Sequence, residues 1–203
     1  VFALSTGLRV GELGGLLWDD IDLEKNMIHV RRQLVYRNLD GTGCKFHIQP
    51  LKTEAGERDI PLTKTAKKAL MKQREYDLLL GKRAKEQPVA GLKNFVFLNH
   101  QGNQLAAQVL DSALRNIIKA YNKNELKQAD KEHRKPFLLP HISAHILRHT
   151  FCTRAAESGV DVKSLQYIMG HADITVTMER YNHVDEARVQ NEMSKTEGIV
   201  KIG

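Results

Sequence analysis

The spacing of apolar residues predicts a chain that is mostly helical. Leucines recur at helical spacing over residues 2–18, and Gly7 interrupts them, so two short helices are expected to meet there. Arg9 would then stand at the start of the second helix, beside backbone N–H groups that favour anions. Helical spacing returns over residues 63–85, where a threonine can cap the first turn, and again over residues 104–121.

Between the first helices and the later ones, apolar and polar residues alternate as they do in strands. Residues 27–36, 44–52 and 58–62 fit three such strands, with turn residues between them. We therefore expect a small antiparallel sheet near residues 27–62. Lys52 would lie at the lip of a β-hairpin, where a long flexible amine can reach across a groove.

The last third of the chain has clear helix signals. Three short helices are expected, each with a capping side chain at its start: Ser143 to Gly159, Asp161 to Gly170, and Asp173 to near Tyr181. Residues 122–140 are rich in Lys, Asn and Glu and contain two prolines, which favours a solvated linker. The whole pattern predicts the α+β class, mainly helical.

Composition indicates a class of partner. Lys and Arg number 31 against 24 Asp and Glu, and the resulting net charge of +7 favours a polyanion, usually nucleic acid. No apolar run approaches the ~18 residues of a membrane span. Cys44 and Cys152 lack metal-type spacing, which favours a reduced, cytoplasmic protein. The chain opens inside a helical pattern without an initiator methionine, so we expect a fragment of a longer protein.

Three histidines lie four residues apart, at His141, His145 and His149. A helical zinc site of the HExxH kind needs a glutamate between its histidines, and here that place is taken by Ile-Leu-Arg, whose arginine would repel a metal. We therefore expect no metal. A capping or core role suits His141 and His149. It suits His145 and Arg148 less well, because this pair shares one helical face and both can donate to a single anion.

Cleavage of a phosphodiester needs cations, an acid and a nucleophile, and the sequence offers all three. Arg9 and Arg148 can hold phosphate oxygens, Lys52 is a mobile acid, and Tyr181 is a candidate nucleophile. With a pKa near 10, only about one phenol in a thousand is ionised at neutral pH, so the attack depends on nearby cations. A core or surface role is the default for the other tyrosines: Tyr36, Tyr76, Tyr121 and Tyr167.

Four segments in order carry a resemblance: TGLRVGELGGLLWDDID, LKTEAGERDIPL, HILRH and MGHADITVTMERYNHV. Together they resemble the motif set of the tyrosine recombinases, in particular the integrases of phages and conjugative transposons. The resemblance implies catalytic roles for Arg9, Lys52, His145, Arg148, His171 and Tyr181, with support from Glu12 and His149. It implies that Lys52 protonates the leaving oxygen, that Tyr181 forms a 3′-phosphotyrosyl bond, and that neither metal, ATP nor any other cofactor takes part.

The resemblance also implies an organisation. Residues 1–181 would form the catalytic domain, one half of a clamp on double-stranded DNA, and residues 182–203 a tail that packs on a neighbouring subunit. Core-binding and arm-binding domains would lie upstream of Val1. The resemblance implies a DNA-bound homo-oligomer, a tetramer, with no membrane or small-molecule partner. It would serve as the integrase or excision-type transposase of a mobile element.

Two other functions stay open at this point. A type IB topoisomerase uses similar residues to relax DNA without exchanging partners. A non-catalytic helix-turn-helix-like DNA-binding protein would also fit the capped short helices and the net charge, but it would need neither Tyr181 nor Lys52. The strand pair around Asp40 is longer than a minimal hairpin, and added DNA or protein contacts there are a hypothesis.

Overall fold

The computed structural model describes residues 1–39, 41–181, 190 and 194, while the side chains of Arg180 and Tyr181 fall outside the description. Its helices are α1 (Phe2–Thr6), α2 (Val10–Gly15), α3 (Lys64–Leu79), α4 (Lys82–Lys85), α5 (Ala107–Lys131), α6 (Ala144–Glu157), α7 (Val162–Met169) and α8 (Thr175–Tyr181). Its strands are β1 (Ile21–Asp22), β2 (Met27–Val30), β3 (Gln33–Arg37), β4 (Lys45–Gln49) and β5 (Arg58–Pro61), with short 3-10 turns at η1 (Trp18–Asp20) and η2 (Glu54–Gly56). The expected mainly helical α+β fold is confirmed.

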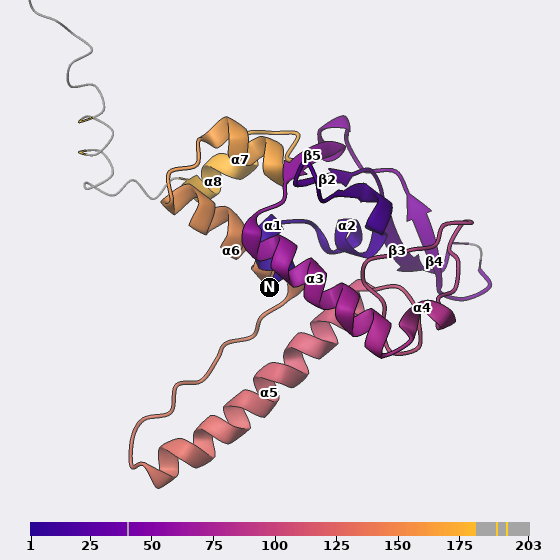
Figure 1. Cartoon of the computed structure of the whole chain (residues 1–203). Coiled ribbons are helices and arrows are strands. Elements are labelled where there is room, and N and C mark those ends of the chain that lie inside the picture. Colours follow the sequence, from indigo (N-terminus) through magenta and orange to yellow (C-terminus); the bar gives the residue numbers. More distant parts are fainter. Residues whose placement is uncertain (40, 182–189, 191–193, 195–203) are drawn as a thin grey trace, which may run out of the picture.

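The strands form two small antiparallel sheets where the sequence predicted one. The order β1-β2-β5 makes the first sheet, and β3 pairs with β4 in the second (Figure 1). The predicted strand over residues 27–36 breaks at Arg31 and Arg32, because both side chains are drawn to carboxylates outside the strand. Arg31 pairs with Asp59 at 2.7 Å, and Arg32 pairs with the carboxylate of Asp20. The chain after this break packs β3 against α2.

A hydrophobic core fixes the first sheet against the opening helices. Ile28 of β2, Ile60 of β5 and Leu70 of α3 are fully or almost fully buried, and they cluster with Leu8 and Leu13 from the start of the chain. A separate apolar cluster joins α6 to α7, and α6 also packs against α1. The start and the last third of the chain therefore meet, which brings motifs more than a hundred residues apart into contact.

The helices α6 and α7 begin where their capping residues predict, whereas α8 begins at Thr175, two residues after the predicted cap Asp173. The hydroxyl of Ser143 accepts a hydrogen bond from the N–H of Ile146 at 3.3 Å. The carboxylate of Asp161 accepts from Lys163 and Ser164 at 3.0 Å each. Because α8 packs against both α6 and α7, the backbone that carries Tyr181 ends beside them. The tail predicted over residues 182–203 lies outside the described residues, apart from positions 190 and 194.

The central helices differ from their predicted ends. α3 stops at Leu79, and Gly81 takes a left-handed conformation (φ 58°) before the short α4. The linker predicted for residues 122–140 is wrong in its first half, since α5 continues through Lys131. Lys, Glu, Leu, Gln and Ala dominate that stretch, and these residues favour a helix even when it is mostly solvated.

Residues 107–143 form an arm, which consists of α5 and the segment that returns beside it. The arm projects from the body of the molecule (Figure 1). The side-chain amide of Asn122 donates to the carbonyl of Leu139 at 3.0 Å and accepts from the N–H of Leu139 at 2.8 Å. These two hydrogen bonds hold the return segment against the helix. Within the described part of the chain, no helix is both long enough and apolar enough to cross a membrane.

Candidate functional site

Arg9 and Glu12 are held together by the start of α2, as the break at Gly7 predicted. Arg9 is the N-cap of α2, and its backbone N–H donates to Oε2 of Glu12 at 2.9 Å. Its guanidinium donates through Nη1 to Oε1 of the same carboxylate at 2.7 Å. Glu12 is buried, whereas the Arg9 side chain is 40% exposed. The pair therefore presents a cation at the surface with its carboxylate behind it.

Arg58 completes this ion pair from the other side, and the sequence analysis missed it. Its side chain is fully buried and donates to both oxygens of Glu12, at 3.2 and 3.0 Å. The signal was present in the sequence, because Arg58 is in phase with Ile60 and Leu62, the inward-facing apolar positions of RDIPL. A charged residue in an apolar phase must find a partner inside the fold.

Three arginines bind the last carbonyl groups of α7. Arg58 donates to the carbonyl of Ile168 at 2.8 Å, Arg148 to that of Met169 at 2.6 Å, and Arg9 to that of Gly170 at 2.8 Å. A helix leaves its final carbonyls without intrahelical partners, and its dipole makes that end favourable for cations. The end of α7 thus gathers guanidinium groups from α2, β5 and α6.

Two glycines allow the chain to turn at these contacts. Gly7 and Gly170 both take left-handed backbone conformations, with φ of 63° and 62°, and each ends a helix. The carbonyl of Gly7 accepts from Nη1 of Arg148 at 2.6 Å. A Cβ on Gly7 would lie 2.3 Å from the ring of Phe151, and one on Gly170 would lie 2.8 Å from Nη1 of Arg58. Both helix ends therefore require glycine for conformation and for space.

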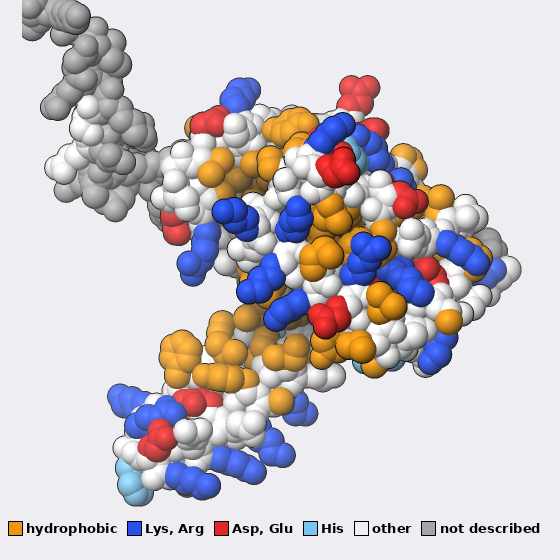
Figure 2. Space-filling view, viewed as in Figure 1, with side chains coloured by type: hydrophobic (Ala, Val, Ile, Leu, Met, Phe, Trp, Pro, Cys, Tyr) orange, Lys and Arg blue, Asp and Glu red, His pale blue; other side chains and the backbone are white. Residues whose placement is uncertain are grey.

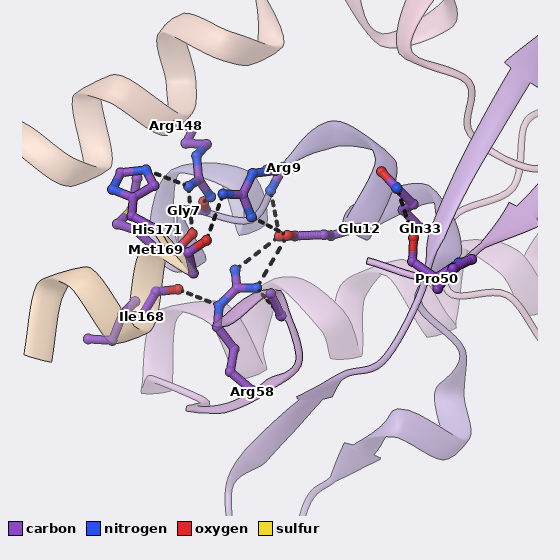
Figure 3. A network of polar contacts seen from close by, with 12 residues as sticks. Gly7, Arg9, Glu12, Gln33, Pro50, Arg58, Arg148, Ile168, Met169 and His171 are labelled. Atoms are coloured by element: carbon purple, nitrogen blue, oxygen red, sulfur yellow. Dashed lines mark hydrogen bonds and ion pairs between the residues drawn. The ribbon is translucent and has the colours of Figure 1, made fainter. Parts of the chain in front are cut away.

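The resulting cluster has an excess of positive charge (Figure 3). Arg9, Arg58 and Arg148 share one carboxylate, Glu12, which leaves two positive charges without a counterion among these four groups. Burial, followed by repulsion from Arg9, lowers the pKa of Arg148 to about 10, so its guanidinium keeps its charge at neutral pH. Such a cluster is electrostatically complementary to an anion.

Glu12 remains ionised in this setting. Burial alone would raise the pKa of its carboxyl group, but hydrogen bonds and charges from Arg58 and Arg9 outweigh that effect and lower the pKa below its ordinary value. A buried carboxylate that accepts several hydrogen bonds is a stable anchor for the two arginines.

His171 serves as a hydrogen-bond acceptor for Arg148. Nη2 of Arg148 lies 2.9 Å from Nε2 of His171, and a guanidinium can only donate, so Nε2 accepts. Nδ1 must then carry the proton in the neutral ring, and it donates to the hydroxyl of the buried Thr177 at 2.9 Å. In this arrangement His171 holds the guanidinium of Arg148 in a fixed orientation.

Burial, followed by the charges of Arg148 and Arg9, lowers the pKa of His171 from 6.5 to about 4. An unfolded chain binds this proton below pH 6.5, but the folded chain binds it only near pH 4. We predict that the free energy of unfolding is insensitive to this group above pH 6.5 and falls as the pH drops from 6.5 toward 4. Urea unfolding at several pH values checks this. His171→Gln should remove that part of the dependence, and an unchanged profile would refute the assignment.

His145 and His149 form a pair on α6. Their Nε2 atoms are 2.5 Å apart, and the rings meet edge to face with centroids 4.1 Å apart. One ring must donate and the other accept, so at least one is neutral in this contact. His145 is exposed and His149 is half-buried.

Lys52 lies in the loop that joins the two sheets, because β4 ends at Gln49 rather than at Lys52 as predicted. The loop is anchored on both sides of the lysine. Gln33 donates to the carbonyl of Pro50 at 2.9 Å, and Arg58 donates to the carbonyl of Gly56 at 2.6 Å. The exposed amine of Lys52 is thereby kept at the edge of the arginine cluster.

A single pocket of about 550 Å³ joins these side chains. Of the predicted catalytic residues it is lined by Arg9, Lys52, His145 and Arg148, and Glu12 also borders it. His171 contacts Arg148, while its chain neighbours Gly170 and Ala172 line the pocket. The backbone of Tyr181 closes α8, and its side chain is outside the described part of the structure, so its place relative to the pocket stays a prediction.

The pocket suits an anion more than a metal ion. Four of its lining residues are Arg or Lys, namely Arg9, Arg37, Lys52 and Arg148. In the described residues no group of three or more His, Cys, Asp and Glu is arranged to hold a metal. Guanidinium groups match the oxygens of a phosphate with paired donors. The described geometry can therefore bind a phosphodiester and stabilise charge that develops on it.

Comparison with known proteins points to one family. The model of the phage integrase family matches residues 1–188. The transposase from transposon Tn916 of Enterococcus faecalis is 36% identical over 193 residues, which cover 95% of this chain and 43% of that protein. Tyrosine recombinase XerD of Listeria monocytogenes is 34% identical over 187 residues, or 92% of this chain and 49% of that protein.

A solved structure agrees with these relatives. The Tn1549 transposon integrase in complex with circular intermediate DNA superimposes with a TM-score of 0.77 at 34% identity, and the match covers 96% of this chain and 57% of that one. The chain spans less than half the length of the curated relatives described above. The resemblance drawn from the four motifs is confirmed, and the chain belongs to the phage integrase family.

Proposed function

We propose that this chain is the catalytic part of a site-specific DNA recombinase of a mobile element. The observation that carries the proposal is the arginine cluster of Arg9, Arg58 and Arg148, which has two excess positive charges beside a pocket edged by Lys52. A phosphodiester has one negative charge, and the pentacoordinate state of its cleavage has a second. The cluster therefore complements the transition state better than the ground state.

In the proposed reaction the phenolic oxygen of Tyr181 attacks phosphorus and gives up its proton to water as the new bond forms. The bond from phosphorus to the 5′ oxygen breaks, and Lys52 donates a proton to that oxygen. Arg9 and Arg148 hold the nonbridging oxygens, with His145 as a further donor at the pocket wall and His171 orienting Arg148. The 3′-phosphotyrosyl bond retains the energy of the broken strand, so a free 5′-hydroxyl can reverse the step without ATP. Metal is not needed, because cationic side chains do the electrostatic work.

The proposal extends to the organisation of the protein. Residues 1–181 would act as the catalytic domain and double-stranded DNA as the substrate, in keeping with the DNA-bound integrase described above. Residues 182–203 would pack on a neighbouring copy in a DNA-bound homo-oligomer, a tetramer for exchange between two duplexes. A bacterial location beside the chromosome is consistent with the bacterial sources of the relatives.

Exchange between two duplexes tests the proposed function. Selection from duplexes of randomised sequence would first identify the preferred site. Two duplexes of different lengths that carry this site are then incubated with the full-length protein in EDTA. We expect strands of recombinant length, and none with Tyr181→Phe. Supercoil relaxation without recombinant strands would favour a topoisomerase-like activity, and binding without cleavage would favour a non-catalytic DNA-binding protein.

A further inference from the structure

α5 carries a basic side chain at every fourth position along its outer part. The row consists of Arg115, Lys119, Lys123, Lys127 and Lys131. All five residues are exposed, and Figure 2 shows Lys and Arg side chains along one edge of the arm. Positions four apart are neighbours on a helix, so the row is continuous and covers about 24 Å of the axis. We refer to these five residues as the basic row.

Little negative charge opposes the basic row. Between Arg115 and Lys131, the two ends of the row, α5 has only two carboxylates, Glu125 and Asp130. Glu125 lies toward the return segment, where it binds Arg134 at 2.5 and 3.1 Å and the N–H of Phe137 at 2.8 Å. These hydrogen bonds, that of Arg134 first, lower the pKa of Glu125 to about 2. Asp130 is exposed and offsets one charge, so most of the positive charge of the row is available to a partner.

The basic row continues from the pocket. Ala107 and Gln108 at the start of α5 line the pocket. Gln108, Arg115 and Lys119 are spaced seven and four residues apart, so they lie on one face of the helix. The polar face that begins at the pocket therefore leads into the basic row. A duplex with one phosphate in the pocket therefore passes the base of the arm, from which the row extends outward.

We propose that the basic row binds the phosphate backbone of the DNA duplex outside the cleavage pocket and does not read its sequence. This inference rests on the proposed function. Four of the five residues are lysines, whose flexible point charges suit phosphates at many positions, whereas base readout uses fixed paired donors. Exposed lysines contribute by releasing counterions from DNA, and the contribution is steeply salt-dependent.

A matched pair of triple variants tests the row. Lys123, Lys127 and Lys131 are changed to Gln, which keeps helix propensity and removes three charges. The control changes Lys64, Lys68 and Lys72 of α3 to Gln, because these lysines are also exposed and four residues apart. The dissociation constant for a duplex of mixed sequence, about four helical turns long, is measured over a range of salt concentrations.

For the α5 variant we expect the slope of log affinity against log salt to become shallower by about 0.9 per lost phosphate contact, or about 2 to 3 for three contacts. The α3 variant should keep the slope of the unmodified chain. Equal changes in both variants would overturn the proposal in favour of a general charge effect. An unaltered α5 slope would overturn it as well, and loss of self-association in that variant would assign the row to a protein partner. All variants are made in the full-length protein, and if the unmodified full-length protein binds no DNA, the proposed function itself fails.

Discussion

Arg148→Ala is expected to slow strand cleavage by about a thousandfold while DNA binding is largely kept. Arg148 is buried between the carbonyls of Gly7 and Met169, so its guanidinium is fixed before a substrate arrives. Preorganised charge of this kind lowers the barrier because no reorganisation is needed as the transition state forms. Single-turnover cleavage of a duplex that carries the preferred site measures the effect.

Misfolding would also slow cleavage, so the electrostatic role of Arg148 needs a separate control. A substrate whose scissile phosphate has a methyl group in place of one nonbridging oxygen carries one negative charge less. The difference in rate between Arg148→Ala and the unmodified protein should shrink on this substrate. If the difference stays the same on both substrates, Arg148 acts through the fold and the electrostatic account of the pocket is wrong.

Glu12→Ala is expected to lower the free energy of unfolding by about 3–5 kcal/mol. The substitution leaves the fully buried guanidinium of Arg58 without its carboxylate, and a buried unpaired charge is the costly outcome. Urea unfolding followed by circular dichroism measures this loss.

Glu57→Ala is the matched control, because Glu57 pairs with Arg31 at the surface, at 3.6 Å and with 63% of its side chain exposed. Exposed pairs contribute about 0–1 kcal/mol, so this variant should unfold almost like the unmodified protein. Replacing Glu12 and Arg58 together by Met should recover part of the stability, since the buried charge of Arg58 is removed together with its partner. Equal losses for Glu12→Ala and Glu57→Ala would contradict the buried network.

Much of the fold could be predicted because its signals are local. Ser143 and Asp161 cap the helices that follow them, and Gly7 separates the first two helices, since each effect depends only on neighbouring residues. The break at Arg31 and Arg32 could not be predicted in the same way, because it depends on Asp59 and Asp20 from other parts of the chain. The continuation of α5 was missed because polar composition was weighed above the helix propensity of the same residues.

In the candidate site, too, the residues within sequence motifs could be predicted, and those that depend on tertiary packing could not. The motifs identified Arg9, Lys52, His145 and Arg148, and the fold places all four at one pocket. Arg58 was missed because its role becomes visible only when β5 packs behind α2 and Glu12 lies between two arginines. The anchoring of three arginines by the end of α7 depends on tertiary packing too, and spacing in the sequence gives no sign of it.

Trapping of the covalent intermediate tests the central claim most directly. The full-length protein is incubated in EDTA with nicked duplexes from which the cleaved strand end diffuses away, and the adduct is digested and mapped by mass spectrometry. The account predicts a denaturation-resistant adduct on Tyr181 that is absent from Tyr181→Phe and strongly reduced in Arg148→Ala. An adduct on a different residue, or cleavage that persists in Tyr181→Phe, would contradict it.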